Sequence, residues 1–374
     1  MKNILIIQSQ VKHYRVPLFT QLHDALAAAG MTLRVAYSEP NTVEKLRSDN
    51  AELPAEFGVI VPSHWFLNHK VQYQSLIRHL LWADFIIVEQ ASRLIMNYFL
   101  IAARSLKLTQ FAYWGHGRNL QKNRSGIAEK IKEIFLNNSD WWFAYTDGTK
   151  NYLAESGVSE DKVTVVRNST DTKKFKHIID SQNPDDVAAL RSSLGVDANG
   201  SVALYCGSLY ENKLIPFLTE CVGEITKSHP NFRLLIVGDG QDRGKAESAA
   251  AANPAIRYCG PMFGDDVAPL FAASDLFLCP GLVGLAILDS FAAGLPLLST
   301  KLDIHSPEIA YLEDGYNGLI TAPNKEAYTQ AIIRCIEDSD LFEKLQTGAR
   351  ESANHYSIEA MVANFRDGIL KAVN

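Results

Sequence analysis

The sequence is organised around residues 280–296, which read PGLVGLAILDSFAAGLP. This stretch follows the apolar run 276–279 and precedes the apolar run 297–299. The pattern is typical of a strand end, a glycine-rich turn, a short helix and the start of the next strand. A ligand held by such a turn would lie beyond the carboxyl end of a parallel sheet, which is where open α/β folds bind their ligands.

Length and composition are those of a globular chain with two domains. The 374 residues exceed what one hydrophobic core usually supports, and 47% of them are hydrophobic and 21% charged. The formal net charge of -6 gives no reason to expect a nucleic acid as partner.

The cysteines and the apolar runs favour a cytoplasmic protein. The five cysteines form no CxxC pair, so we expect reduced core thiols rather than disulfides or a zinc site. The amino terminus runs directly into the apolar residues 4–7 without a signal-peptide cleavage site, and the longest apolar runs are too short to span a bilayer.

Short apolar runs alternate with helical patterns along the chain, as in βα units on parallel sheets. In the first half, strands are expected at 4–7, 32–37, 85–88, 110–114, 141–145 and 163–166. A second series follows at 202–206, 232–237, 256–259, 276–279 and 297–299. We therefore predict an α/β fold with two Rossmann-like domains facing each other across a cleft. The predicted divisions are domain 1–175 joined by the helix 358–374, a polar linker region 176–200, and domain 201–357.

An ordered set of motifs resembles the retaining glycosyltransferases of the GT-B fold, specifically the glycosyltransferase family 4 group. The resemblance covers nearly the whole chain and rests on 166–175, 207–209 (GSL), Lys213, 237–240 (VGDG), 280–296, 305–308 (HSPE) and 314–320 (DGYNGLI). It implies a C-terminal domain that binds a nucleotide-diphosphate sugar, with a UDP-sugar favoured, and an N-terminal domain that binds the acceptor. It also implies hexosyl or N-acetylhexosaminyl transfer without a cofactor or a metal. The implied acceptor is a saccharide or a lipid-linked saccharide in surface polysaccharide or glycolipid synthesis.

The expected donor site departs from the family pattern at two positions. Lys213 matches the cation that faces the donor phosphates, but Ser208 stands where most relatives carry an arginine. Relatives have two glutamates eight residues apart, and this chain has Gly281 and Asp289 at those positions. Asp289 retains a carboxylate for the ribose hydroxyls, so we interpret Gly281 as an altered donor site. We expect Gly281→Glu to change donor preference or activity at least tenfold.

Backbone groups complete the expected donor site. The amides of the 280–296 turn, of Gly207 and of Gly240 are candidate hydrogen-bond donors to the sugar and the phosphates. Glu308 and His305 precede a helix start close to the donor in relatives. The remaining predicted donor-binding residues are Gly238, Asp239, Leu282, Val283, Gly284 and Leu285.

The first half offers candidates for catalysis and for the acceptor. His116 lies between glycines at a strand end and is, with Lys213, the candidate catalytic residue, although a structural histidine is the alternative. His13 and Arg15 follow the first strand and are assigned to the acceptor or phosphate side. Arg118 and Lys122 begin a basic helix face, which is either simply solvated or binds an anionic acceptor or the inner face of the membrane.

Two other functions remain open at this stage. The departures at Ser208 and Gly281 would also suit a non-catalytic protein that binds sugar nucleotides or glycans. A sugar-nucleotide epimerase of the same fold is the second alternative, whereas a phosphorylase would need a cofactor-bearing lysine. Formation of a glycosylated product from a purified acceptor would distinguish a glycosyltransferase from these alternatives.

Overall fold

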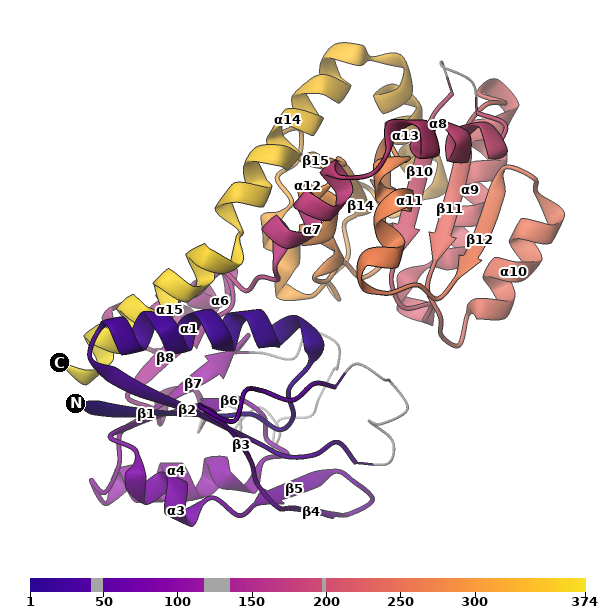
Figure 1. Ribbon diagram of the computed structural model, residues 1–374. Helices are drawn as coiled ribbons and strands as arrows, with labels where there is room; N and C mark the ends of the chain where they lie inside the picture. The colour runs from indigo at the N-terminus through magenta and orange to yellow at the C-terminus, as the bar shows by residue number, and fades with distance from the viewer. Residues whose placement is uncertain (42–49, 118–134, 197–199) are drawn as a thin grey trace. The chain divides into compact units, whose positions relative to one another are not determined.

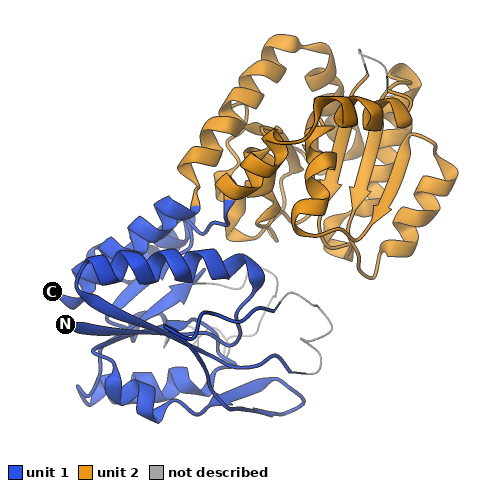
Figure 2. Ribbon diagram, in the orientation of Figure 1, with its two compact units in different colours: residues 1–171, 358–374 blue, residues 172–357 orange. Residues whose placement is uncertain are grey.

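The structure is a computed structural model that describes residues 1–41, 50–117, 135–196 and 200–374, and it consists of two compact units (Figures 1 and 2). The N-terminal unit contains residues 1–171 together with 358–374, and the C-terminal unit contains residues 172–357. Each unit is an α/β structure around a parallel sheet, as predicted.

The sheet of the N-terminal unit has the strand order β3-β2-β1-β6-β7-β8-β9, and all its pairings are parallel. Its strands are β1 (Lys2–Ile7), β2 (Met31–Tyr37), β3 (Gly58–Ile60), β6 (Phe85–Glu89), β7 (Phe111–Gly115), β8 (Trp141–Ala144) and β9 (Val163–Val165). The six strands predicted in this half are present, and β3 is an addition at the edge. The order reverses between β1 and β6, which places a topological switch point there.

Helices cover both faces of this sheet (Figure 1). On one face lie α1 (Val16–Ala28) and the terminal helix α15 (Ile358–Val373), whose Phe365 stacks on Phe143 with ring centroids 4.9 Å apart. On the other face lie α3 (Ile77–Trp82) and α4 (Ile95–Ser105), where Leu76 and Leu100 are buried against the strands. This face also carries α6 (Asp147–Glu155) and the hairpin of β4 (Ser63–Phe66) and β5 (Val71–Gln74).

The sheet of the C-terminal unit has the order β12-β11-β10-β13-β14-β15 and is also parallel. Its strands are β10 (Val202–Cys206), β11 (Arg233–Val237), β12 (Ile256–Gly260), β13 (Leu276–Leu278), β14 (Leu297–Thr300) and β15 (Gly318–Thr321). Its longer helices are α9 (Ile215–Ser228), α10 (Arg243–Ala252), α13 (Lys325–Glu337) and α14 (Ser339–His355), and the shorter ones are α11 (Ala268–Ala272) and α12 (Ala286–Ala292). The order reverses between β10 and β13.

The polar segment 176–200, predicted as a linker region, is largely helical instead. Helix α7 (Thr172–Asp180) buries Ile179, and helix α8 (Pro184–Ser193) follows it. The guanidinium of Arg191 forms an ion pair with Asp275 at 3.0 Å and donates to the carbonyl of Gly200 at 2.8 Å. The polar residues that suggested a linker are therefore exposed faces of helices that belong to the C-terminal unit.

The cysteines are unpaired, as expected from their spacing. All five cysteines are free thiols, and Cys221, Cys279 and Cys335 are buried. Among the residues that the structure describes, no helix combines the length and the apolar character needed to cross a bilayer.

Candidate active site

Two loops of the C-terminal unit meet at its topological switch point. Residues 207–214 follow β10, and residues 279–285 follow β13, the neighbouring strand. Because both strands end at the same edge of the sheet and their crossovers run to opposite sides, the loops border the crevice in which such sheets bind ligands. The stretch 280–296 thus occupies the expected position.

The β13 turn is fixed to the β10 loop through backbone contacts. The amide of Leu282 donates to the carbonyl of Asn212 at 2.8 Å, and the Lys213 ammonium donates to the carbonyl of Leu282 at 2.5 Å. A Cβ atom on Gly281 would lie 2.6 Å from the Cα of Lys213, which is closer than real Cβ atoms approach. A glycine at 281 is therefore required by the packing of the two loops.

His305 holds the turn from the opposite side. Its Nδ1 accepts a hydrogen bond from the Val283 amide at 3.1 Å, so its proton is on Nε2, which donates to the carbonyl of Thr300 at 2.8 Å. Burial lowers the pKa of His305, and the nearby Lys213 ammonium lowers it further, whereas the bond to Thr300 raises it. His305 is thus a neutral structural link with both ring nitrogens occupied, rather than a donor-binding group.

These contacts occupy two of the turn amides that were expected to bind the sugar. The amides of Leu282 and Val283 already donate to Asn212 and His305 within the protein. The side chains of Leu282 and Val283 are buried, while Gly284 and Leu285 are partly exposed. The contact of this turn with the sugar stays a prediction.

The glycines after β11, Gly238 and Gly240, serve loop packing in the same way. The Gly207 amide donates to the carbonyl of Val237 at 3.0 Å, and the Gly240 amide donates to the Asp239 carboxylate at 2.8 Å. A Cβ on Gly238 would collide with the carbonyl oxygen of Gly207. These two amides are engaged within the chain, and the predicted phosphate contacts of Gly207 and Gly240 stay predictions.

Asp289 presents the unengaged carboxylate of the site. It lies in α12, is partly buried, and accepts no hydrogen bond from any residue that the structure describes. Burial raises its pKa to about 7, and its charge adds to the burial that raises the pKa of the Cys206 thiol to about 12. Asp289 thus faces the end of β10, where a ligand hydroxyl would satisfy it.

The other predicted residues of this unit differ in their exposure. Ser208 is exposed, and its carbonyl accepts a hydrogen bond from the Tyr205 hydroxyl at 2.8 Å. Asp239 is exposed, whereas Glu308 is buried in the first turn of a 3-10 helix at Pro307–Tyr311. Lys213 is the cation of the site.

In the N-terminal unit, His116 and Arg15 have opposite surroundings. His116 is exposed directly after β7, with its ring 6.0 Å from that of Tyr145. Arg15 is buried: it donates to the Asn168 side chain at 2.7 Å and its guanidinium lies 4.8 Å from the ring centroid of Trp114. The guanidinium of Arg15 is thus engaged within its own unit, and its assignment to the acceptor or phosphate side stays a prediction.

The remaining candidates of this unit are His13, Arg118 and Lys122. His13 is exposed in a short 3-10 helix, His13–Arg15, before α1. Arg118 and Lys122 lie outside the described residues, so their predicted role stays a prediction. Asn212 and Thr300 were missed by the sequence analysis, because they act through backbone carbonyls and leave no side-chain pattern.

Comparisons with known proteins agree with this fold and site. Residues 200–338 match the family model described as "Glycosyl transferases group 1". The chain is 26% identical over 206 residues to an alpha-monoglucosyldiacylglycerol synthase of Acholeplasma laidlawii, a match that covers 54% of this chain and 50% of that protein. It is also 26% identical over 235 residues to the lipopolysaccharide core biosynthesis glycosyltransferase LpsE of Rhizobium meliloti, a match that covers 61% of this chain and 63% of LpsE. The chain thus spans only about half to two thirds of these relatives.

Solved structures resemble the chain over its full length. A glycosyltransferase from Rickettsia africae superposes with a TM-score of 0.72 at 19% identity, covering 100% of this chain and 98% of that one. HepE of Anabaena in complex with UDP and glucose superposes with a TM-score of 0.69 at 16% identity, and the match covers 99% of this chain and 100% of HepE.

The protein therefore has the GT-B fold. Residues 200–338, within its C-terminal unit, match the model of the group 1 glycosyl transferases. The resemblance predicted from the sequence is confirmed at this level.

Proposed function

We propose that the chain is a glycosyltransferase that moves a sugar from a nucleotide-diphosphate sugar to a saccharide or lipid-linked saccharide. A UDP-sugar is the favoured donor, because HepE, which has the same fold, was solved with UDP and glucose. The names of two relatives refer to a glucosyldiacylglycerol and to the lipopolysaccharide core, which supports a glycolipid or surface polysaccharide as product.

The observation that carries this proposal is the unengaged carboxylate of Asp289 at the switch point. The carboxylate of Asp289 is partly buried and accepts no hydrogen bond within the described parts of the chain, so the two hydroxyls of a ribose can donate to it. Lys213 stands on the neighbouring loop, where its ammonium can stabilise the negative charge that grows on the departing diphosphate. Transfer with retention, of a hexosyl or N-acetylhexosaminyl group and without a metal, is part of the proposal.

The test is turnover with the purified chain. We expect product from a UDP-sugar and an acceptor such as a diacylglycerol glycolipid, and we expect Asp289→Ala to reduce turnover at least 100-fold. Asp340→Ala, which removes an exposed carboxylate on α14 of the same unit, is the matched control and should keep most of the activity.

A second candidate function is that of a non-catalytic sugar-nucleotide-binding protein. It is favoured by Ser208, which offers no cation, and by Gly281, where loop packing leaves no room for a second carboxylate. Tight UDP-sugar binding that Asp289→Ala abolishes, combined with no transfer to any acceptor, would favour this function.

A further inference from the structure

One face of the N-terminal unit exposes large apolar side chains. This α3–α4 face is formed by α3, α4 with the residues after it, and the β4–β5 hairpin (Figure 1). The buried sides of α3 and α4 pack on the sheet through Leu80 and Leu100. The outward side chains are 51–85% exposed, and the main ones are Phe66, Ile77, Leu81, Phe99, Leu106 and Leu108.

The same face lacks acidic residues. Neither segment 62–83 nor segment 90–110 contains an Asp or a Glu, although about one residue in nine of the whole chain is acidic. The two segments carry five Lys or Arg residues. Arg104 pairs with Asp140 and Arg93 lies near Glu89, both acids being outside these segments. The exposed cations are Lys70, Arg78 and Lys107, for which no ion pair occurs within the described parts of the chain.

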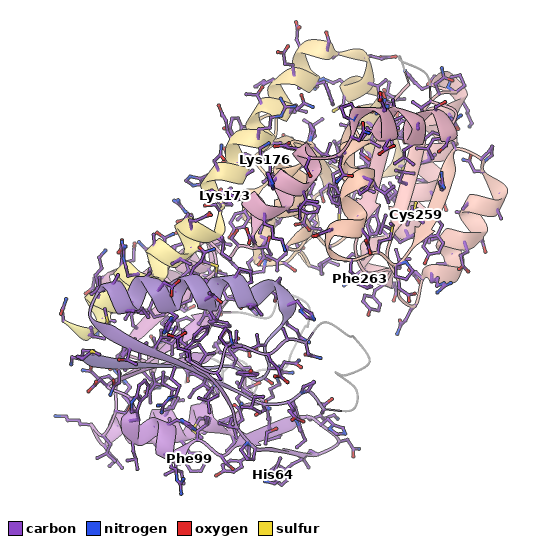
Figure 3. All side chains as sticks on the ribbon, viewed as in Figure 1. His64, Phe99, Lys173, Lys176, Cys259 and Phe263 are labelled. Atoms are coloured by element: carbon purple, nitrogen blue, oxygen red, sulfur yellow. The ribbon has the colours of Figure 1, made fainter. Side chains whose placement is uncertain are left out.

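Apolar and basic groups alternate along this face. Arg78 lies between Ile77 and Leu81 on α3, and Lys107 lies between Leu106 and Leu108 at the end of α4. Figure 3 shows Phe99 and His64 on the same side of this unit, both directed away from the sheet. A surface of this kind is expected to interact with something apolar that also carries negative charge.

A second copy of the chain fits this surface poorly. A two-fold contact would place the α3–α4 face against itself, because the interface of a symmetric dimer uses the same patch on both subunits. Lys70, Arg78 and Lys107 would then face like charges without an acid to pair with. An anionic bilayer offers both the apolar phase and the negative headgroups.

We propose that the α3–α4 face docks on an anionic lipid bilayer. Ile77, Leu81, Leu106 and Leu108 enter the boundary between headgroups and acyl chains, and the three exposed cations contact the headgroups. This surface differs from the basic segment after residue 117. The proposal is independent of the proposed function, because docking requires no donor and no turnover.

Vesicle sedimentation with the full chain tests the proposal. We expect binding to vesicles of phosphatidylcholine with 30% phosphatidylglycerol, weaker binding to pure phosphatidylcholine, and a loss of binding as salt is raised. The triple variant Lys70→Glu, Arg78→Glu, Lys107→Glu should weaken binding at least tenfold, since each charge near anionic lipid contributes about fivefold. The double variant Leu81→Gln, Leu108→Gln should weaken it as well.

Matched controls change similar side chains elsewhere. Lys371→Glu reverses an exposed charge on α15, and Phe263→Gln removes a 76% exposed aromatic residue from the C-terminal unit. Both should bind vesicles like the wild type, and all variants should keep the wild-type circular dichroism spectrum. Absence of vesicle binding, or equal loss in the controls, would overturn the proposal. A concentration-dependent dimer that Leu81→Gln, Leu108→Gln abolishes would assign the face to a second copy instead and would also overturn it.

Discussion

The backbone of Gly281 rests against the backbone of Lys213. A Cβ atom on Gly281 would lie 2.6 Å from the Lys213 Cα and 2.5 Å from its carbonyl carbon. Both residues belong to the loops that border the switch point, so the glycine sets the spacing of the site. This changes what a substitution at 281 is expected to do.

We predict that Gly281→Ala and Gly281→Glu have the same effect. Either side chain must push the two loops apart, at a cost of about 1–3 kcal/mol for overpacking. That cost corresponds to a melting temperature lower by about 2–12 °C for a unit of this size. Thermal unfolding with and without UDP measures both the stability and the loss of nucleotide binding.

Gly284→Ala is the control for this prediction. A Cβ on Gly284 would meet only the Ser306 hydroxyl, at 3.8 Å, which is an ordinary contact. We expect it to unfold like the wild type. If Gly281→Glu kept full stability and altered donor choice while Gly281→Ala did neither, the earlier interpretation of an altered donor site would be the correct one.

Donor binding is predicted to strengthen with pH through the titration of Asp289. Its pKa of about 7 means that much of the free protein holds a protonated carboxyl at neutral pH. Ribose hydroxyls donate to the ionised form, so binding below pH 7 must also remove a proton. The affinity for a UDP-sugar should therefore rise up to tenfold per pH unit below about pH 7 and level off above pH 8.

Calorimetry with UDP-glucose between pH 5.5 and 8.5 measures this dependence, because its diphosphate does not titrate in that range. Asp289→Asn should bind more weakly and lose the dependence on pH, while Asp340→Asn, which changes an exposed carboxylate on α14, should retain it. A wild-type affinity that stays constant across the range would contradict the assignment.

His305 is predicted to make the protein less stable in mild acid. Because its pKa is lowered in the folded state, the folded protein binds a proton less readily than the unfolded chain. The stabilisation is present above about pH 6.5 and is lost as the pH falls, since protonated Nδ1 can no longer accept the Val283 amide. His305→Ala should cost about 1–3 kcal/mol at pH 8, because it leaves buried backbone groups unpaired.

The difference between the wild type and His305→Ala should narrow at pH 5. Urea unfolding at both pH values gives the two free energies. The control His355→Ala changes an exposed histidine of the same unit. Its unfolding free energy should differ from that of the wild type by the same small amount at both pH values. If the difference in unfolding free energy between the wild type and His305→Ala were the same at both pH values, protonation of the imidazole would not weaken its contact with the turn.

The fold was largely predictable because its strands are continuous apolar runs. Strands β10 and β11 are buried on both faces, so the sequence marks them clearly. The strands β3 and β15 were missed, since none of the three residues of β3 is buried, and β15 begins at a glycine and is buried over only half its length. The segment 176–200 was misjudged because exposed helix faces and linkers share the same polar composition.

The candidate site was predictable in its position and less so in its contacts. The turn 280–296 and the carboxylate of Asp289 follow from the pattern of residues. The contacts of Gly281 and His305 do not, because they join backbone atoms of loops that lie far apart in the sequence. Arg15 looked like a ligand-binding cation, but the sequence does not reveal that Asn168 and Trp114 enclose it.

Lys213 is predicted to serve the reacting phosphates rather than the stability of the loop. Its ammonium donates to the Leu282 carbonyl at 2.5 Å, and its remaining protons are available to a ligand. Lys213→Met keeps the aliphatic stem and removes the charge. We expect kcat/KM for a UDP-sugar to fall at least 100-fold, because charge on the leaving diphosphate is then left unstabilised.

Two further variants serve as controls for Lys213→Met. Lys213→Arg should recover part of the loss, and Lys245→Met, which removes an exposed lysine of α10 paired with Asp242, should leave kcat/KM unchanged. If Lys213→Met lowered the melting temperature but kept kcat/KM, the lysine would be a structural link between the two loops and nothing more.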